Sequence, residues 1–140
     1  KHSNFEVALQ VPLIISDSRL PNAAHTNSIA ELVDIYPTLC ELTAGESPTH
    51  LQGSSLVSAL EAPGTIFKDV ALARWQKGET LIVDQLFYTE WQRKDKVVSK
   101  MLYNHETDPN ETNNLANDPA YLSTVKALSQ QLEQFKTTFN

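Results

Sequence analysis

The sequence predicts an α/β fold in two parts: the end of a larger α/β domain, then a small α+β subdomain in which one helix packs on an antiparallel sheet. An unbroken apolar run at residues 11–15 (VPLII) is typical of a strand that is buried on both faces. After a Pro-Gly break near Ala62, strand-like runs follow one another with very short connections, which favours antiparallel neighbours. An apolar stripe at helical spacing follows these runs. We therefore expect residues 1–62 and 63–140 to be the two domains.

The first strand is expected at residues 11–15, shortly after the polar segment KHSN at residues 1–4. No start methionine or signal peptide precedes this segment, so we expect the chain to begin inside a larger protein. Open α/β sheets bind ligands at strand ends, and the polar segment lies at one end of the predicted strand. Its side chains are therefore candidates for a binding site.

The segment DIYPTLCEL at residues 34–42 predicts a helix. Pro37 fits the first turn, because in a helix interior its ring and missing N–H cost about 3 kcal/mol. Asp34 is then the expected N-cap, with its carboxylate accepting hydrogen bonds from first-turn amides. We expect Leu39 and Leu42 to face the core.

Further along, a short helix is expected at residues 53–60 (GSSLVSAL), packed by Leu56 and Leu60. The strand-like runs come next and predict a meander or a pair of hairpins. Their expected positions are residues 70–75, 80–84, 87–91 and 100–104.

The last helix is expected to begin with Asp118 as N-cap and Pro119 at its first position. Apolar residues then recur at spacings of four and three, which places them on one face of a helix. They are Tyr121, Val125, Leu128, Leu132 and Phe135. Such a stripe needs a partner surface, and the preceding antiparallel sheet is the nearest one.

Composition excludes several classes of partner. The chain has 140 residues and a net charge of −6, and its 11 basic residues are spread thinly along the sequence, which disfavours nucleic acid as a partner. No apolar run approaches the roughly 20 residues that span a bilayer, and the acidic balance disfavours anionic lipid surfaces. The single cysteine, Cys40, cannot form an internal disulfide, so it leaves the cellular compartment open.

Four segments, in this order and spacing, resemble the C-terminal third of type I sulfatases, which belong to the alkaline-phosphatase-like superfamily. They are KHSNFEVALQVPLII, ELVDIYPTLCELTAG, QGSSLVSAL and KMLYNHETDPNETNNLAND. The iduronate-2-sulfatase-like branch is the most similar, and the resemblance covers nearly the whole chain. It implies that residues 1–62 end the large α/β sandwich of that family and that residues 63–140 form its small C-terminal subdomain.

The resemblance implies a hydrolase that cleaves sulfate esters of a uronate-containing polysaccharide or oligosaccharide, with a formylglycine nucleophile and calcium as cofactor. The Cys/Ser-x-Pro-x-Arg motif that gives rise to formylglycine does not occur in residues 1–140, and neither do the calcium ligands of the family. We therefore expect this segment alone not to be a competent enzyme, and the remainder of the sulfatase chain to be its partner. The family implies a periplasmic, secreted or lysosomal location.

Lys1 and His2 are the first candidate site residues. Lys1 matches the family lysine that contacts the sulfate group, which implies a catalytic and substrate-binding role. An ammonium in a water-poor site stabilises the negative charge that ester cleavage builds. His2 adjoins Lys1 and is expected to line the same pocket. The alternative for Lys1 is a solvated residue without a role.

Trp75 and Lys77 are the second candidates, in the turn RWQKG. The resemblance implies that this turn enters the substrate cleft. An indole can stack on a sugar face, and a cation can bind a uronate carboxylate or a second sulfate. The alternative is that Trp75 packs in the core of the subdomain and that Lys77 is a solvated hairpin residue.

Other polar residues favour structural roles. His105 and Asp108 lie in NHETDPNE, which is expected to be a turn held by side-chain bonds around Pro109 rather than a metal site. The strand pair also departs from the iduronate-2-sulfatase-like pattern, because it lacks arginines that members of that branch often carry. The residues at those places are Ile82, Gln85 and Phe87.

Two other functions stay open. A phosphodiesterase or phosphonate hydrolase of the same superfamily would keep the scaffold and carry Thr in place of the Cys or Ser of the nucleophile motif. A non-catalytic carbohydrate-binding module would use Trp75 and Trp91 as platforms for sugars.

Overall fold

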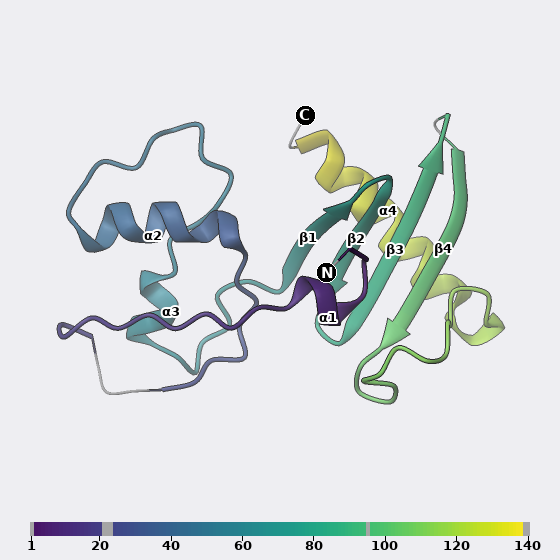
Figure 1. The fold of residues 1–140 in the computed structure, drawn as a ribbon, viewed down its shortest axis with the longest axis horizontal. Coiled ribbons are helices and arrows are strands. Elements are labelled where there is room, and N and C mark those ends of the chain that lie inside the picture. Colours follow the sequence, from purple (N-terminus) through teal and green to yellow (C-terminus); the bar gives the residue numbers. More distant parts are fainter. Residues whose placement is uncertain (1, 21–23, 95, 139–140) are drawn as a thin grey trace. The chain divides into compact units, whose positions relative to one another are not determined.

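The computed structural model describes residues 2–20, 24–94 and 96–138. The chain divides into two compact units, one made of Lys1–Pro12 with Leu72–Asn140 and the other of Leu13–Ala71. The first unit holds most of the sheet and the long C-terminal helix, and the second holds short helices (Figure 1). The predicted domains, residues 1–62 and 63–140, concern the whole protein and stay a prediction.

The sheet is a four-stranded meander in the order β1-β2-β3-β4. Its strands are β1 (Val70–Trp75), β2 (Gly78–Val83), β3 (Leu86–Arg93) and β4 (Lys96–Asn104). The antiparallel pairing of β2 with β3 and of β3 with β4 confirms the predicted arrangement. Short turns connect the strands, and Gln76 and Asp84 within them have φ +52, in the left-handed region.

One face of the sheet packs on helix α4 (Leu122–Thr138). Successive side chains of a strand point to opposite faces. Leu81, Tyr88 and Leu102, which are paired across β2, β3 and β4, therefore share this face, and all three are fully buried. From the helix, the buried side chains are Val125, Leu128 and Leu132. The predicted apolar stripe of the last helix is therefore confirmed at its centre.

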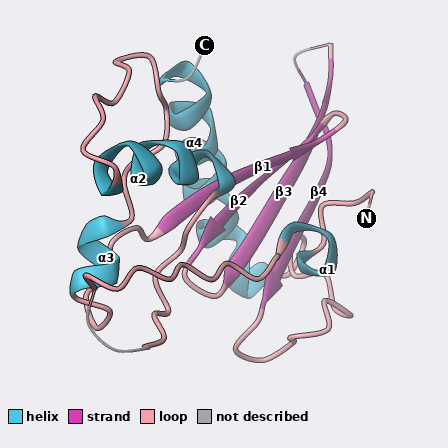
Figure 2. Cartoon of the chain, turned by 60° about the vertical axis from the view of Figure 1, so that its left-hand side comes forward, coloured by secondary structure: helices cyan, strands magenta, loops and turns pink. Residues whose placement is uncertain are grey.

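The other face of the sheet carries Phe87, Met101 and Tyr103, a buried cluster against which Ile82 and Trp91 pack. The opening segment of the chain, with the single-turn helix α1 (Glu6–Leu9), lies over this face. Figures 1 and 2 show α1 and α4 on opposite faces of the sheet.

The start of the last helix agrees with the prediction. Asp118 accepts a hydrogen bond from the backbone N–H of Ala120 at 2.8 Å, and Pro119 opens the 3₁₀ turn η2 (Pro119–Tyr121) that leads into α4. The aspartate therefore satisfies one of the amides that a helix start leaves unpaired.

The second unit contains the 3₁₀ turn η1 (Leu32–Asp34) and the helices α2 (Ile35–Leu42) and α3 (Val57–Glu61). The two helices confirm the predicted elements, although α3 begins later than expected. Pro37 lies in the first turn of α2, as its ring requires.

The predicted role of Asp34 as the side-chain cap of α2 is wrong. Its backbone is already helical, with φ −78 and ψ −16, because η1 continues directly into α2. The buried carboxylate accepts instead from the backbone N–H of Glu31 at 2.8 Å and of Ser54 at 2.9 Å. Lys68 Nζ lies 2.7 Å from it and neutralises its charge. Burial lowers the pKa of Lys68, but Asp34 and Glu31 outweigh that effect and raise it above its usual value.

The prediction that Leu39 and Leu42 face the core is wrong for this unit. Leu39 is 52% exposed and Leu42 half-buried, whereas Thr38 is buried. The hydroxyl of Thr38 donates to Asp34 O at 2.5 Å and accepts from Leu56 N–H at 2.9 Å. These bonds turn the Thr38 side of α2 inward.

The expected strand at residues 11–15 is also absent from the described part of the chain. These residues have no regular structure, and Ile14 is 90% exposed. A strand needs a neighbouring strand to satisfy its backbone groups, and no described residue pairs with this segment. In addition, no helix among the described residues has the length and apolar character that crossing a bilayer requires.

Replacing Leu128 by Ala should lower the free energy of unfolding by roughly 2–5 kcal/mol, because the side chain is 5% exposed between α4 and the sheet. Chemical denaturation of the complete protein measures this. Lys126→Ala, on the exposed side of the same helix, is the matched control and should change stability by less than about 0.5 kcal/mol. Equal, small effects of both substitutions would contradict the packing described above.

Candidate functional site

Asn4 fixes the opening segment to the sheet. Its side chain is buried, at 3% exposure, and Nδ2 donates to Gly78 O at 3.0 Å and to Thr80 Oγ1 at 2.9 Å. A Cβ at position 78 would lie 2.8 Å from Asn4 Oδ1 and 2.7 Å from Nε1 of Trp91. Glycine at position 78 therefore leaves the space that this close approach requires.

A second group of contacts holds the segment two residues later. The backbone N–H of Glu6 donates to Glu111 Oε2 at 3.0 Å. The ring of His105 lies between the two carboxylates, with Nδ1 at 3.4 Å from Glu6 Oε1 and Nε2 at 3.2 Å from Glu111 Oε1. The same ring stacks on Phe87, with a centroid separation of 3.9 Å. The opening segment is thus held at two places on one face of the sheet.

These contacts bring His2 to Trp75. The two rings have centroids 4.8 Å apart and an interplanar angle of 38°. Trp75 is half-buried at the end of β1, and His2 is exposed. Lys1, the predicted sulfate-contacting residue, lies outside the described residues. Two of the four predicted site residues, distant in sequence, are therefore in contact.

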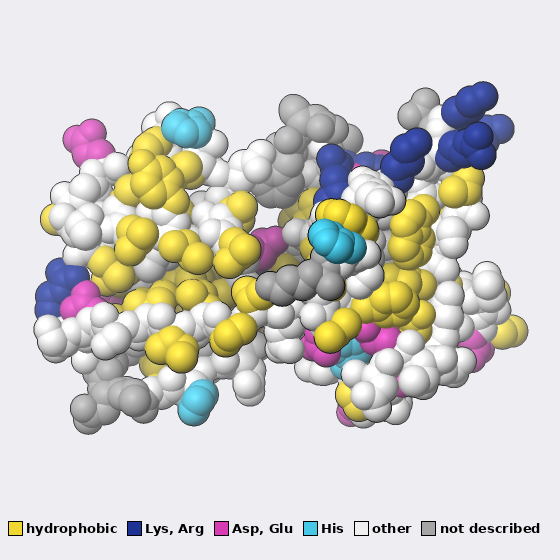
Figure 3. Space-filling view, viewed as in Figure 1, with side chains coloured by type: hydrophobic (Ala, Val, Ile, Leu, Met, Phe, Trp, Pro, Cys, Tyr) yellow, Lys and Arg dark blue, Asp and Glu magenta, His cyan; other side chains and the backbone are white. Residues whose placement is uncertain are grey.

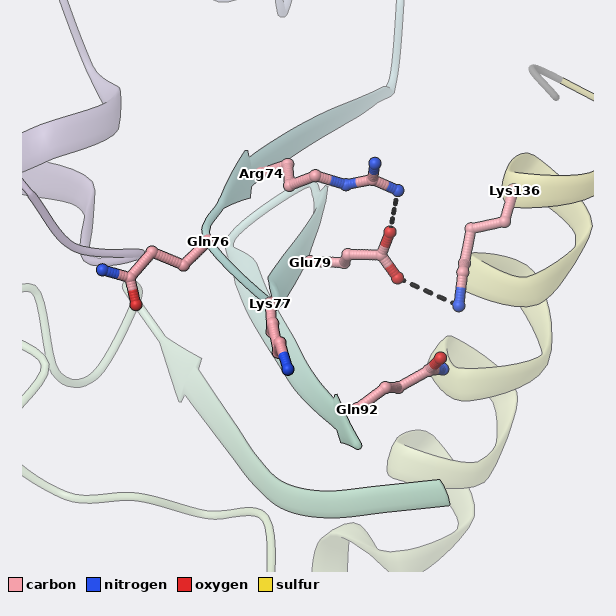
Figure 4. Close-up of a pocket in the computed structure, with 6 residues that line it drawn as sticks. All are labelled: Arg74, Gln76, Lys77, Glu79, Gln92 and Lys136. Carbon is pink, nitrogen blue, oxygen red and sulfur yellow. Dashed lines mark hydrogen bonds and ion pairs between the residues drawn. The ribbon is translucent and has the colours of Figure 1, made fainter. Parts of the chain in front are cut away.

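Lys77 lies in a different environment. It helps to line a shallow pocket of about 270 Å³ together with residues of β1, the β1–β2 turn, β2, β3 and α4 (Figure 4). These are Arg74, Gln76, Glu79, Gln92 and Lys136. Arg74 and Trp75 are consecutive residues of a strand, so their side chains point to opposite faces. The structure therefore brings Lys77 to Arg74 rather than to His2.

Glu79 is the centre of the pocket. Its carboxylate pairs with Arg74 and, at 2.9 Å, with Lys136 Nζ. Burial raises the pKa of Glu79, but Lys136 and Arg74 outweigh it, so the pKa lies below its usual value and the side chain is ionised at neutral pH. Lys136 also binds Glu133 at 2.9 Å. Lys77 is exposed and has no ion-pair partner among the described residues, so its ammonium can bind an anionic group.

Arg74, Glu79, Lys136 and Asn4 were not among the predicted site residues. The pair Arg74–Glu79 could have been predicted from the sequence. A two-residue connection places positions 74 and 79 opposite each other, where opposite charges attract. No local sequence pattern predicts the contacts of Asn4 and Lys136, since each contact joins segments that are far apart in sequence.

The remaining candidates have structural roles. Asp108 accepts from the backbone N–H groups of Thr112 and Asn113, both at 2.8 Å, which confirms the predicted turn and lowers the pKa of Asp108. Glu90 accepts from the hydroxyls of Tyr88 and Ser129, both at 2.6 Å. In the described part of the chain, no group of three or more His, Cys, Asp or Glu side chains is placed to hold a metal ion.

The family model of N-sulphoglucosamine sulphohydrolase, C-terminal, matches residues 1–138. The chain belongs to this family. A sulfatase of Formosa agariphila is 26% identical over 141 residues, which cover 100% of this chain and 27% of the relative. The family therefore confirms the predicted resemblance to the C-terminal part of a sulfatase, whereas the iduronate-2-sulfatase-like branch stays a prediction.

Solved structures confirm the predicted α/β fold class. A 2-O GAG sulfatase is similar with a TM-score of 0.65 and 25% identity, over 76% of this chain and 24% of the other. A structure described as in complex with its substrate D-glucosamine-2-N,6-O-disulfate has a TM-score of 0.67 and 22% identity, with the same coverage of this chain and of the other. Phosphonate monoester hydrolases also share the fold. The sulphohydrolase C-terminal segment spans about a quarter of the length of these relatives.

Asn4→Ala should release the opening segment, because the carbonyl of Gly78 and the hydroxyl of Thr80 lose a buried donor. In the complete protein we expect faster amide hydrogen exchange at residues 5–9 and a loss of about 1–3 kcal/mol of stability. Gln10→Ala is the matched control, since Gln10 is exposed and only its backbone is hydrogen-bonded. Unchanged exchange at residues 5–9 would show that Asn4 does not anchor the segment.

Proposed function

We propose that the complete protein hydrolyses sulfate esters of a uronate-containing glycan, and that this chain supplies one wall of the substrate cleft. The observation behind this proposal is the junction of the opening segment with the RWQKG turn, where the His2 ring packs at a tilt against Trp75 and Asn4 donates to Gly78 O. An aromatic platform and nearby cations are the groups that recognise an anionic sugar. Membership of a sulphohydrolase family supports a sulfate ester as the reacting group.

Within this proposal, Lys1 contacts the sulfate. This role rests on the family resemblance of the opening segment, in which Lys1 directly precedes His2. Its ammonium would stabilise the charge that builds on the sulfate oxygens and on the leaving oxygen.

His2 and Trp75 form the sugar platform, and Lys77 binds a carboxylate or a second sulfate. Trp75 and Lys77 are two residues apart at the tip of one hairpin, which places them within about 7 Å along the backbone. Because Lys77 lies on the side of Arg74, an oligosaccharide that contacts both side chains must cross the tip of this hairpin.

The remaining machinery is proposed to lie in other parts of the protein. Family membership implies a divalent metal, and we propose calcium, held by ligands outside residues 1–140. Such a cation stabilises negative charge on the sulfate oxygens. The formylglycine nucleophile also belongs to the remainder of the sulfatase chain, and the proposed location is periplasmic, secreted or lysosomal.

The test of this proposal compares a small aryl sulfate with the matching aryl phosphonate as substrates of the complete protein. Hydrolysis of the sulfate in preference to the phosphonate supports the proposal, and the reverse preference supports a phosphonate hydrolase. The carbohydrate-binding alternative needs Trp91 as a platform, but Trp91 packs against the Phe87 cluster.

Lys1→Ala should lower kcat for the aryl sulfate by about a hundredfold or more, because a group that stabilises transition-state charge is lost. The melting temperature should stay nearly the same, since a pocket cation contributes little to packing. Lys126→Ala, the loss of an exposed cation on α4, is the control for charge alone and should leave both quantities unchanged. Parallel losses of turnover and stability would mean that Lys1 has a structural role.

Trp75→Ala and Lys77→Ala should each raise KM for a sulfated oligosaccharide. Loss of one charge-assisted contact is worth roughly 1.5–3 kcal/mol, which corresponds to tenfold or more in kcat/KM. The measurement is the ratio of kcat/KM for the oligosaccharide to that for a small aryl sulfate, which offers neither a sugar face nor a second anion. A ratio that equals the wild-type value would show that this turn does not contact the glycan.

A further inference from the structure

Lysines and arginines that are dispersed in the sequence gather at one end of the sheet. A meander brings its β1–β2 and β3–β4 turns to the same end, and Figure 3 shows the cationic side chains grouped over the β3–β4 hairpin. The residues at this end are Arg74, Lys77, Arg93, Lys94, Lys96 and Lys136. Basic residues that are spread thinly along the sequence therefore share one end of the sheet.

The β1–β2 turn contacts the end of β3 that leads into the β3–β4 turn. The backbone N–H of Gln92 donates to Lys77 O at 3.4 Å, so Lys77 lies beside the start of the hairpin that carries Arg93 and Lys94. In the register of β3 with β4, Arg93 is paired with Lys96. Like charges at paired positions repel each other, and an anion that binds both side chains would reduce the repulsion between Arg93 and Lys96.

The cations of the described residues fall into two groups, those with a carboxylate partner and those without one. Among the described residues, Arg19, Lys68, Arg74, Lys100 and Lys136 each have a carboxylate partner. Lys77, Arg93, Lys94 and Lys96 are exposed and have no carboxylate partner among those residues, although the chain has 17 acidic residues. We call these four residues the hairpin surface. Within residues 2–20, 24–94 and 96–138, Lys126 is the one further cation without a carboxylate partner, and it lies on the exposed side of α4.

We propose that the hairpin surface binds sulfate or carboxylate groups of glycan residues beyond the one that stacks on Trp75, so that the protein acts on an extended sulfated chain. This inference rests on the proposed function. The surface continues directly from the Trp75–Lys77 turn through the Gln92 contact, so a glycan bound at that turn is the anionic chain best placed to reach it. Exposed cations that gain anionic partners release counterions, which gives binding that weakens with salt.

The experiment uses the complete protein and two probes, heparin and the same chains after chemical desulfation. The triple variant Arg93→Ser, Lys94→Ser, Lys96→Ser removes charge from exposed positions. Lys126→Ser is the matched control, because it removes an exposed, unpaired cation outside the surface. Dissociation constants are measured between about 50 and 200 mM NaCl, and melting temperatures report folding.

We expect the triple variant to bind heparin about tenfold more weakly at the lower salt concentration, with a shallower dependence on salt. The control should bind as the wild type does. Desulfated chains keep only their carboxylates, so they should bind more weakly than heparin to all three proteins. If the triple variant does not fold, Lys94→Ser alone makes the same comparison, with a smaller expected loss.

Unchanged heparin binding by the variant would overturn the inference. An equal loss of binding to single-stranded DNA, with the same salt dependence, would also overturn it, since the surface would then be a general polyanion site. Hydrolysis of the aryl sulfate by the wild type decides the proposed function separately. If the wild type hydrolyses the aryl sulfate but the triple variant binds heparin normally, the proposed function stands and the inference about the hairpin surface fails.

Discussion

The buried amide of Asn4 is the contact on which the arrangement of the candidate site depends. It joins the opening segment to Gly78 and Thr80 at the start of β2, and Thr80 Oγ1 is in turn 2.8 Å from Thr89 Oγ1 of β3. A polar group that is buried in this way is costly unless its bonds are made, so the segment has one favourable position on the sheet. His2 reaches Trp75 because of that position.

The two faces of the sheet have different roles. The α4 face contains Leu81, Tyr88 and Leu102 and holds the unit together. Its polar groups are satisfied internally, as Glu90 shows by accepting from both Tyr88 and Ser129. The opening segment lies over the other face, where it contacts the start of β2 and the segment after β4. The two candidate residues Trp75 and Lys77 lie where β1 turns into β2.

Local sequence was sufficient for the sheet and for α4, because short connections, alternation and the Asp118-Pro119 start act between near neighbours. It was not sufficient for Asp34, whose partner Lys68 is 34 residues away, or for residues 11–15, which need a strand to pair with. The same division holds for the site. The cross-strand pair Arg74–Glu79 could be predicted from the length of the turn, whereas Lys136 reaches Glu79 only once α4 has packed on the sheet.

Charge is separated along the strands, and this separation gives the opening segment a direction. The cations lie at the end with the β1–β2 and β3–β4 turns, whereas the β2–β3 turn and the segment after β4 carry Asp84, Glu106, Asp108 and Glu111 at the opposite end. The opening segment runs from His2 at the basic end to Glu6 beside Glu111 at the acidic end. The potential of such a distribution attracts an anionic chain to the end where His2 and Trp75 meet and disfavours its binding at the other. Under the proposed function, this distribution directs an anionic glycan along the turns at the basic end, where the opening segment begins.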